Sequence, residues 1–89
     1  MAIVRFTSSF EKITGQESIN LKAETLGRLC RELVHMYGPK MEILLDESGN
    51  ISRRIIILVD RRNAQTLSGA DTILKEDTEV LLLPFFGGG

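Results

Sequence analysis

The chain has 89 residues, of which 43% are hydrophobic and 26% are charged, so one small domain with a single core is expected. Eleven Lys and Arg residues against twelve Asp and Glu residues give a net charge of −1, which argues against general attraction to nucleic acid or to acidic membranes. The single cysteine excludes an intramolecular disulfide and suits a reducing compartment. The sequence has no signal-peptide pattern and no apolar run long enough to span a bilayer, so we expect a cytoplasmic protein.

The first 22 residues are typical of a β-hairpin. Residues 1–7 predict the first strand, with Val4 and Phe6 on one face and Arg5 and Thr7 on the other. Residues 8–16 are rich in Ser, Thr and Gly and are expected to form the turn. Ile19 and Leu21 then alternate with polar residues in a second strand.

An amphipathic helix is predicted to follow, with signals at both ends. Thr25 is a suitable N-cap, and the helix is expected to run to Tyr37, because Gly38 fits the C′ position and Pro39 cannot continue the helix. Apolar side chains recur at spacings of three and four residues, which indicates that the helix lies on a sheet. These positions are Leu26, Leu29, Cys30, Leu33, Met36 and Tyr37.

The second half of the chain predicts three more extended segments. Residues 41–46 are expected to form a strand, residues 48–50 a tight turn and residues 51–60 the next strand. Residues 61–77 form a polar connection before the last strand at residues 79–84. The apolar side chains of this connection that are expected to reach the core are Leu67, Ile73 and Leu74.

This order of elements predicts an α+β fold of the β-grasp, or ubiquitin-like, type. We expect a mixed sheet of about four to five strands with one main helix packed on one face. The first and last strands would lie parallel at its centre, which explains why the last strand is apolar on both faces. Residues 1–84 would form this domain, and residues 85–89 a flexible tail ending in diglycine.

One face of the predicted sheet suggests a partner-binding surface. A single helix covers only one face, yet Ile56 and Leu58 point away from the face that carries Ile55, Ile57 and Val59. We expect Ile56 and Leu58 to bind a partner protein. The alternative is that residues 60–77 fold over them.

The last strand leads from Pro84 through Phe85 and Phe86 directly into three glycines. Glycine loses more conformational freedom on ordering than any other residue, so residues 87–89 do not stabilise a fold. Without side chains they can lie in a narrow channel and bring the carboxylate of Gly89 into another protein's active site. The two phenylalanines are expected to dock on that partner. The alternative reading of the tail is a frayed end or a cloning remnant.

The other potentially reactive residues fit structural roles better than catalytic ones. His35 falls on the polar face of the helix with no nucleophile nearby, and Cys30 falls on the core face. A lone His and a lone Cys cannot form a four-ligand zinc site, so no metal is expected. Residues 87–89 precede no helix and are therefore no phosphate loop. The arginine pairs at 53–54 and 61–62 are expected to solvate a sheet edge, and the alternative is that they pair with acidic residues of a partner.

The C-terminal third resembles the MoaD/ThiS sulfur-carrier family. The residues that carry the resemblance are Val59 through Gln65, Leu67, Gly69, Asp71-Thr72, Leu74-Lys75, Asp77, Glu79-Val80, and Pro84 followed by Gly88-Gly89. The hairpin, the capped helix and the strand order are similar to the family's β-grasp over the rest of the chain. The sequence departs from the family at Gly87, where a small non-glycine residue is common, and at Phe85 and Phe86.

The resemblance implies a carrier that is not itself an enzyme and holds no cofactor. It implies that a ubiquitin-activating-type enzyme adenylates Gly89 with ATP, that the product becomes a thiocarboxylate, and that this group donates sulfur to a synthase subunit. Gly88 would complete the diglycine, and Pro84 would begin the projecting tail. The resemblance favours the small subunit of molybdopterin synthase. Carriers for thiamine, cysteine or methionine synthesis, protein modifiers, and a plain interaction domain are the alternatives.

Overall fold

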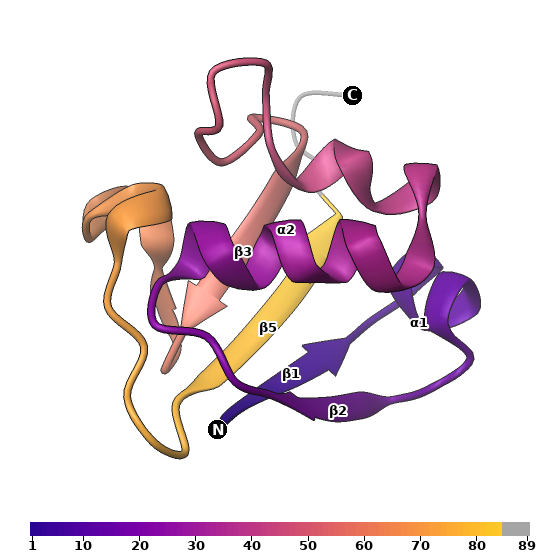
Figure 1. The fold of residues 1–89 in the computed structure, drawn as a ribbon, viewed down its shortest axis with the longest axis horizontal. Coiled ribbons are helices and arrows are strands. Elements are labelled where there is room, and N and C mark those ends of the chain that lie inside the picture. The colour runs from indigo at the N-terminus through magenta and orange to yellow at the C-terminus, as the bar shows by residue number, and fades with distance from the viewer. Residues whose placement is uncertain (85–89) are drawn as a thin grey trace.

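Residues 1–84 form a mixed five-stranded sheet with one long helix across one face (Figure 1). This computed structural model describes residues 1–84. The strands are β1 (Ala2–Phe6), β2 (Ser18–Leu21), β3 (Ile55–Val59), β4 (Arg62–Asn63) and β5 (Glu79–Pro84). The helical segments are α1 (Ser9–Thr14), α2 (Leu26–Tyr37) and three 3-10 turns, η1 (Pro39–Leu44), η2 (Ala64–Thr66) and η3 (Gly69–Asp71). The sheet order is β2-β1-β5-β3-β4, which confirms the predicted β-grasp fold.

Strands β1 and β5 form the predicted parallel pair at the centre of the sheet. Their register runs from Ile3 opposite Glu79 to Phe6 opposite Leu82. Strand β3 pairs antiparallel with the other side of β5. Because β5 has a neighbour on each side as far as Leu82, its backbone groups there are hydrogen-bonded within the sheet.

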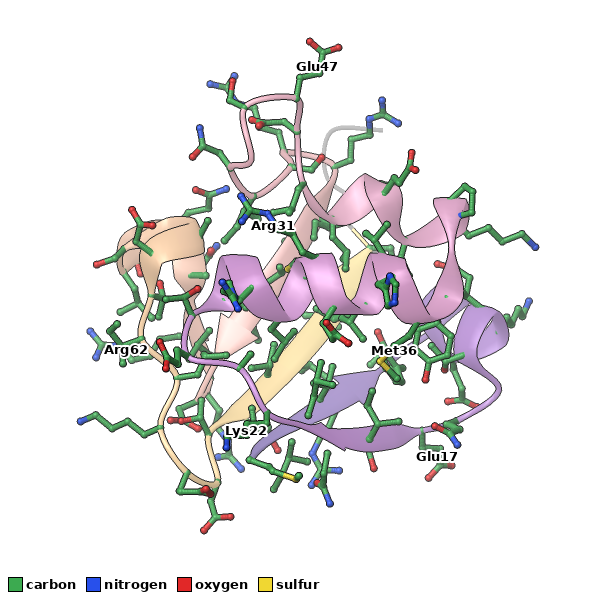
Figure 2. All side chains as sticks on the ribbon, in the orientation of Figure 1. Glu17, Lys22, Arg31, Met36, Glu47 and Arg62 are labelled. Atoms are coloured by element: carbon green, nitrogen blue, oxygen red, sulfur yellow. The ribbon has the colours of Figure 1, made fainter. Side chains whose placement is uncertain are left out.

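Helix α2 begins and ends where the capping residues predict. The Thr25 hydroxyl accepts a hydrogen bond from the Arg28 N–H at 3.3 Å. At the other end Gly38 has φ of +84°, and its N–H donates to the Val34 carbonyl at 2.7 Å. The placement of Met36 on the core face was wrong, because this side chain is 46% exposed, and Figure 2 shows it at the surface of α2.

The core lies between α2 and the inner face of the sheet. Its buried strand residues alternate along the chain, as a strand with one packed face requires. These residues are Ala2, Val4, Phe6, Ile55, Ile57, Val59, Val80 and Leu82. Helix α2 contributes Leu26, Leu29, Cys30 and Leu33. The predicted division of β3 into an inner and an outer face is therefore confirmed.

Two predicted segments have a different secondary structure. Residues 8–16 contain the short helix α1, because Phe10 is buried in the core and pulls this segment onto the sheet. Residues 41–46 are no strand: η1 covers most of them, and Met41 and Leu44, three residues apart, are both buried. The next strand consequently begins at Ile55 instead of residue 51, while the turn at Gly49, with φ of +83°, is confirmed.

The connection between β3 and β5 packs beside α2 (Figure 1). Leu74 is buried as predicted and Leu67 packs partly against the core, but Ile73 is 65% exposed, so that prediction was wrong. The reason is a short antiparallel bridge to the start of α2, in which the Leu26 N–H donates to the Thr72 carbonyl at 3.0 Å. Extended backbone alternates its side chains, so burying Thr72 and Leu74 turns Ile73 outward.

Candidate functional site

The face of the sheet opposite α2, here called the outer face, carries a cluster of apolar side chains. Its members come from the two adjacent strands β3 and β5 and are half-buried: Ile56, Leu58, Leu81 and Leu83. Leu58 lies directly opposite Leu81, and Ile56 directly opposite Leu83. Side chains so paired across two strands contact each other, so the four residues form one continuous apolar surface. Ile56 and Leu58, expected from the sequence, thus belong to a larger surface.

The connecting segment does not cover this outer face. Ala64 and Leu74 are buried in the inner core, and η3 contacts α2, so residues 60–77 lie with the helix layer. Figure 1 shows the same arrangement, with this segment beside the start of α2. The alternative that residues 60–77 fold over Ile56 and Leu58 was therefore wrong.

An ion pair borders the apolar surface on the β1 side. The Arg5 Nε donates to the Glu79 Oε2 at 2.6 Å, and Arg5 lies opposite Leu81 in the parallel register. The Arg5 side chain is 52% exposed, so solvent weakens this pair, and its remaining N–H donors are available to a partner. The sequence analysis missed both residues, because their contact depends on the pairing of segments 74 residues apart.

The described part of the chain ends with β5, the strand that precedes the predicted tail. Pro84, the last described residue, is half-buried and lies opposite Ile55 at the start of β3. Thr7 holds the same end of β5, since its hydroxyl donates to the Leu82 carbonyl at 2.8 Å. The tail residues predicted to act lie outside the described residues; they are Phe85, Phe86, Gly87, Gly88 and Gly89.

The remaining reactive side chains are arranged as structural groups. Cys30 is fully buried, and this burial raises the pKa of its thiol to about 12, so it remains a protonated core residue at neutral pH. His35 is exposed on α2, as predicted. Figure 2 shows Glu47 and Arg62 projecting outward at the edge of the molecule.

Within residues 1–84, no group of three or more His, Cys, Asp and Glu side chains is placed to hold a metal ion. The helices of the described part of the chain are all too short or too polar to cross a membrane.

The mixed sheet and its single long helix define, within residues 1–84, a class of protein, the ubiquitin-like β-grasp proteins. The structure is similar to the crystal structure of an Amycolatopsis orientalis BexX/CysO complex, with a TM-score of 0.87, 19% identity and full coverage of both chains. It is also similar to the solution structure of small archaeal modifier protein 1 from Methanosarcina acetivorans, with a TM-score of 0.84 and 24% identity, covering 99% of this chain and 95% of the other.

Within this class, a sequence profile of the ThiS family matches residues 4–89, and the chain belongs to that family. A putative sulfur carrier protein of Archaeoglobus fulgidus is 31% identical over 90 residues, which covers 100% of both chains. The sulfur carrier protein CysO of Mycobacterium bovis is 30% identical over 77 residues, covering 84% of this chain and 83% of the relative. The resemblance inferred from the C-terminal third is therefore confirmed at the level of the family.

Proposed function

We propose that the chain carries sulfur on the carboxyl group of Gly89. An adenylating enzyme of the ubiquitin-activating type would join this carboxylate to the α-phosphate of ATP and release pyrophosphate. A hydrosulfide ion would then attack the acyl carbon, expel AMP and lose its proton, leaving a thiocarboxylate. The activation step is needed because a carboxylate has no leaving group and its delocalised charge makes it a poor electrophile.

The observation that supports this proposal is the position of the apolar outer face: half of its residues lie on β5, the strand that leads to residues 85–89. Leu81 and Leu83 lie in β5, within a few residues of Pro84, and no segment of residues 1–84 packs its buried side chains there. A partner that binds this face is therefore well placed to receive residues 85–89 in its active site. The domain would supply binding and orientation, while ATP and the catalytic groups would belong to the partner.

The test is ATP–pyrophosphate exchange by the adenylating enzyme of the source organism. Wild-type chain should support exchange, and deletion of Gly89 should abolish it, because the shorter tail cannot bring its carboxylate to the bound ATP. Persisting exchange after this deletion contradicts the proposal.

The parallel arrangement of β1 and β5 supplies a matched control. Because these strands are parallel, Met1 and Pro84 lie at opposite ends of the sheet (Figure 1). A hexahistidine peptide added before Met1 should leave exchange unchanged. The same peptide added after Gly89 should abolish it, because the reactive carboxylate is then displaced.

The pathway that receives the sulfur can be distinguished by a separate experiment. Molybdopterin, favoured by the resemblance, stays a prediction, while the similarity to a relative named CysO supports the alternative of cysteine synthesis. Thiocarboxylated chain carrying a radioactive sulfur atom should transfer this label in an extract of the source organism. Label recovered in cysteine favours the cysteine pathway, and label recovered in molybdopterin favours molybdopterin synthase.

A protein modifier is the second candidate, supported by the similarity of fold to small archaeal modifier protein 1. The same adenylate would then be attacked by a lysine amine of a target protein, which releases AMP and forms an isopeptide bond. A ladder of conjugates in the source organism that disappears on deletion of Gly89 would favour this function.

A further inference from the structure

We propose that Thr7 is a positioning residue: its hydroxyl fixes the end of β5 and thereby aims the reactive tail. This inference rests on the proposed function, because it concerns how the carboxylate of Gly89 reaches a partner's active site. The observations that carry it are the end of the β1–β5 pairing, one long-range hydrogen bond and an unusual backbone conformation at Ser8.

The pairing of β1 with β5 stops before β5 ends. Phe6 opposite Leu82 is the last residue pair, and two further residues of β5, Leu83 and Pro84, extend beyond it. Immediately after Thr7 the chain leaves the sheet, with φ of 47° and ψ of −122° at Ser8, and enters α1. A non-glycine residue is strained in this conformation, so the exit of β1 from the sheet is held by its surroundings.

Where the backbone pairing with β1 ends, a side-chain hydrogen bond from Thr7 takes its place. Its hydroxyl donates to the Leu82 carbonyl at 2.8 Å, in a partly buried position and across 75 residues of sequence. Backbone groups of successive strand residues point to opposite sides, so the Leu82 carbonyl and the backbone of Pro84 face the side of β1. Pro84 has no N–H to donate there. Within residues 1–84, the Thr7 hydroxyl thus supplies the last hydrogen bond to β5 from the β1 side, next to the contacts that α1 makes with this strand.

Beyond Leu82, β5 is paired on the β3 side through Leu83 with Ile56 and Pro84 with Ile55. A strand end held on one side frays more readily than one held on both sides. Fraying would enlarge the set of directions in which the tail leaves the domain. A bound complex would then spend less time with the carboxylate at the ATP, which lowers the rate of the chemical step.

The experiment compares Thr7→Val with Thr7→Ser and with a matched control, Thr66→Val. Valine keeps the shape of threonine and removes the hydroxyl, while serine restores it. The Thr66 hydroxyl makes the same kind of bond, to the Asn63 carbonyl at 2.7 Å, in an exposed turn outside the end of β5. The kinetics of pyrophosphate release are measured for each chain with the adenylating enzyme of the source organism, with the chain as the varied substrate.

We expect Thr7→Val to lower kcat about fivefold at an unchanged KM, as for the loss of one hydrogen bond. Thr7→Ser should restore most of the rate, and Thr66→Val should match the wild type. A purely structural role gives a different result, because a partly unfolded substrate raises the apparent KM and leaves kcat unchanged. That result, or equal kcat values for Thr7→Val and the wild type, overturns the inference.

A second measurement does not need the enzyme. The backbone amide order parameter of Leu83 in solution should fall in Thr7→Val, toward about 0.6 or below, and remain at the wild-type value in Thr66→Val. An unchanged value in Thr7→Val overturns the inference even if adenylation proceeds. If the adenylating enzyme releases no pyrophosphate with the wild-type chain, the proposed function itself is wrong, and the role of Thr7 in it is wrong as well.

Discussion

Replacing Leu58 by alanine tests whether the outer face of the sheet binds the adenylating enzyme. Leu58 is half-buried, opposite Leu81 in β5, and it points away from the core. Fully burying a leucine side chain contributes about 1.5–3 kcal/mol, and only the smaller part of the Leu58 surface is exposed, so covering that part with a partner contributes at most about 1 kcal/mol. Losing this contribution should raise the KM for adenylation up to about fivefold.

The expected effect is confined to KM, because the alanine variant still carries the complete tail. A contact with the enzyme that is equally strong in the ground state and in the transition state contributes to KM only. Its loss therefore raises KM and leaves kcat unchanged. This separates Leu58 from Thr7, whose loss should act on kcat. The assay is pyrophosphate release at varied concentrations of the chain, with circular dichroism to verify that each variant is folded.

Ile73→Ala is the matched control for Leu58→Ala. Ile73 is 65% exposed and lies in the connection beside α2, outside the outer face, so its truncation also removes apolar surface from the domain. Its KM should equal that of the wild type. An unchanged KM for folded Leu58→Ala, or an equal rise in both variants, would refute the assignment of the outer face as the binding surface.

Three further predictions concern the domain itself. Gly27→Ala should destabilise it by about 1 kcal/mol in urea unfolding, because the overpacking cost exceeds the gain in helix propensity: the new Cβ would lie 3.1 Å from the Ala70 carbonyl oxygen. Equal or greater stability would contradict this contact. Arg61→Gly should stabilise the domain by about 0.5 kcal/mol, since Arg61 has φ of 70° in the hairpin between β3 and β4; a loss of stability would contradict the turn assignment. Cys30 should react with a thiol-specific disulfide reagent at pH 8 only as fast as the domain unfolds, because burial raises its pKa to about 12; fast reaction in the folded state would contradict this burial.

Local signals in the sequence predicted the elements whose ends are set by local chemistry. Thr25 and Gly38 cap α2 through contacts within one turn of the helix, so both ends could be predicted. Gly49 marks its turn for the same reason. The order of the elements was sufficient to predict the central position of β5, and the apolar pattern on both of its faces agreed with that position.

The segments that were predicted wrongly depend on distant partners. Residues 41–46 contain a short apolar run that suits a strand, and only the core shows that Met41 and Leu44 are buried together at helical spacing. Pro39 at the start of η1 was the available signal for a helical turn. The orientation of Ile73 follows from a bridge to Thr25, which lies 48 positions earlier in the chain (73 − 25 = 48).

The residues of the candidate site also fall into two groups, those that local sequence signals predict and those whose contacts join distant segments. Pro84, Ile56 and Leu58 could be proposed from the sequence because they follow from strand alternation and from the end of the last strand. The Arg5–Glu79 pair and the Thr7–Leu82 hydrogen bond join segments 74 and 75 residues apart. Which residues meet across β1 and β5 depends on the register of a parallel pair, and the residue pattern of one sequence does not specify it.

The central claim is that the carboxyl group of Gly89 carries the sulfur. Intact-mass measurement of the chain purified from its source organism tests this most directly. We predict a species heavier than the free acid by the difference between one sulfur and one oxygen atom, with fragmentation that places the added mass on Gly89, and we predict its loss when Gly89 is deleted. A chain found only as the free acid during active sulfur transfer, or a sulfur adduct that survives this deletion, would contradict the account.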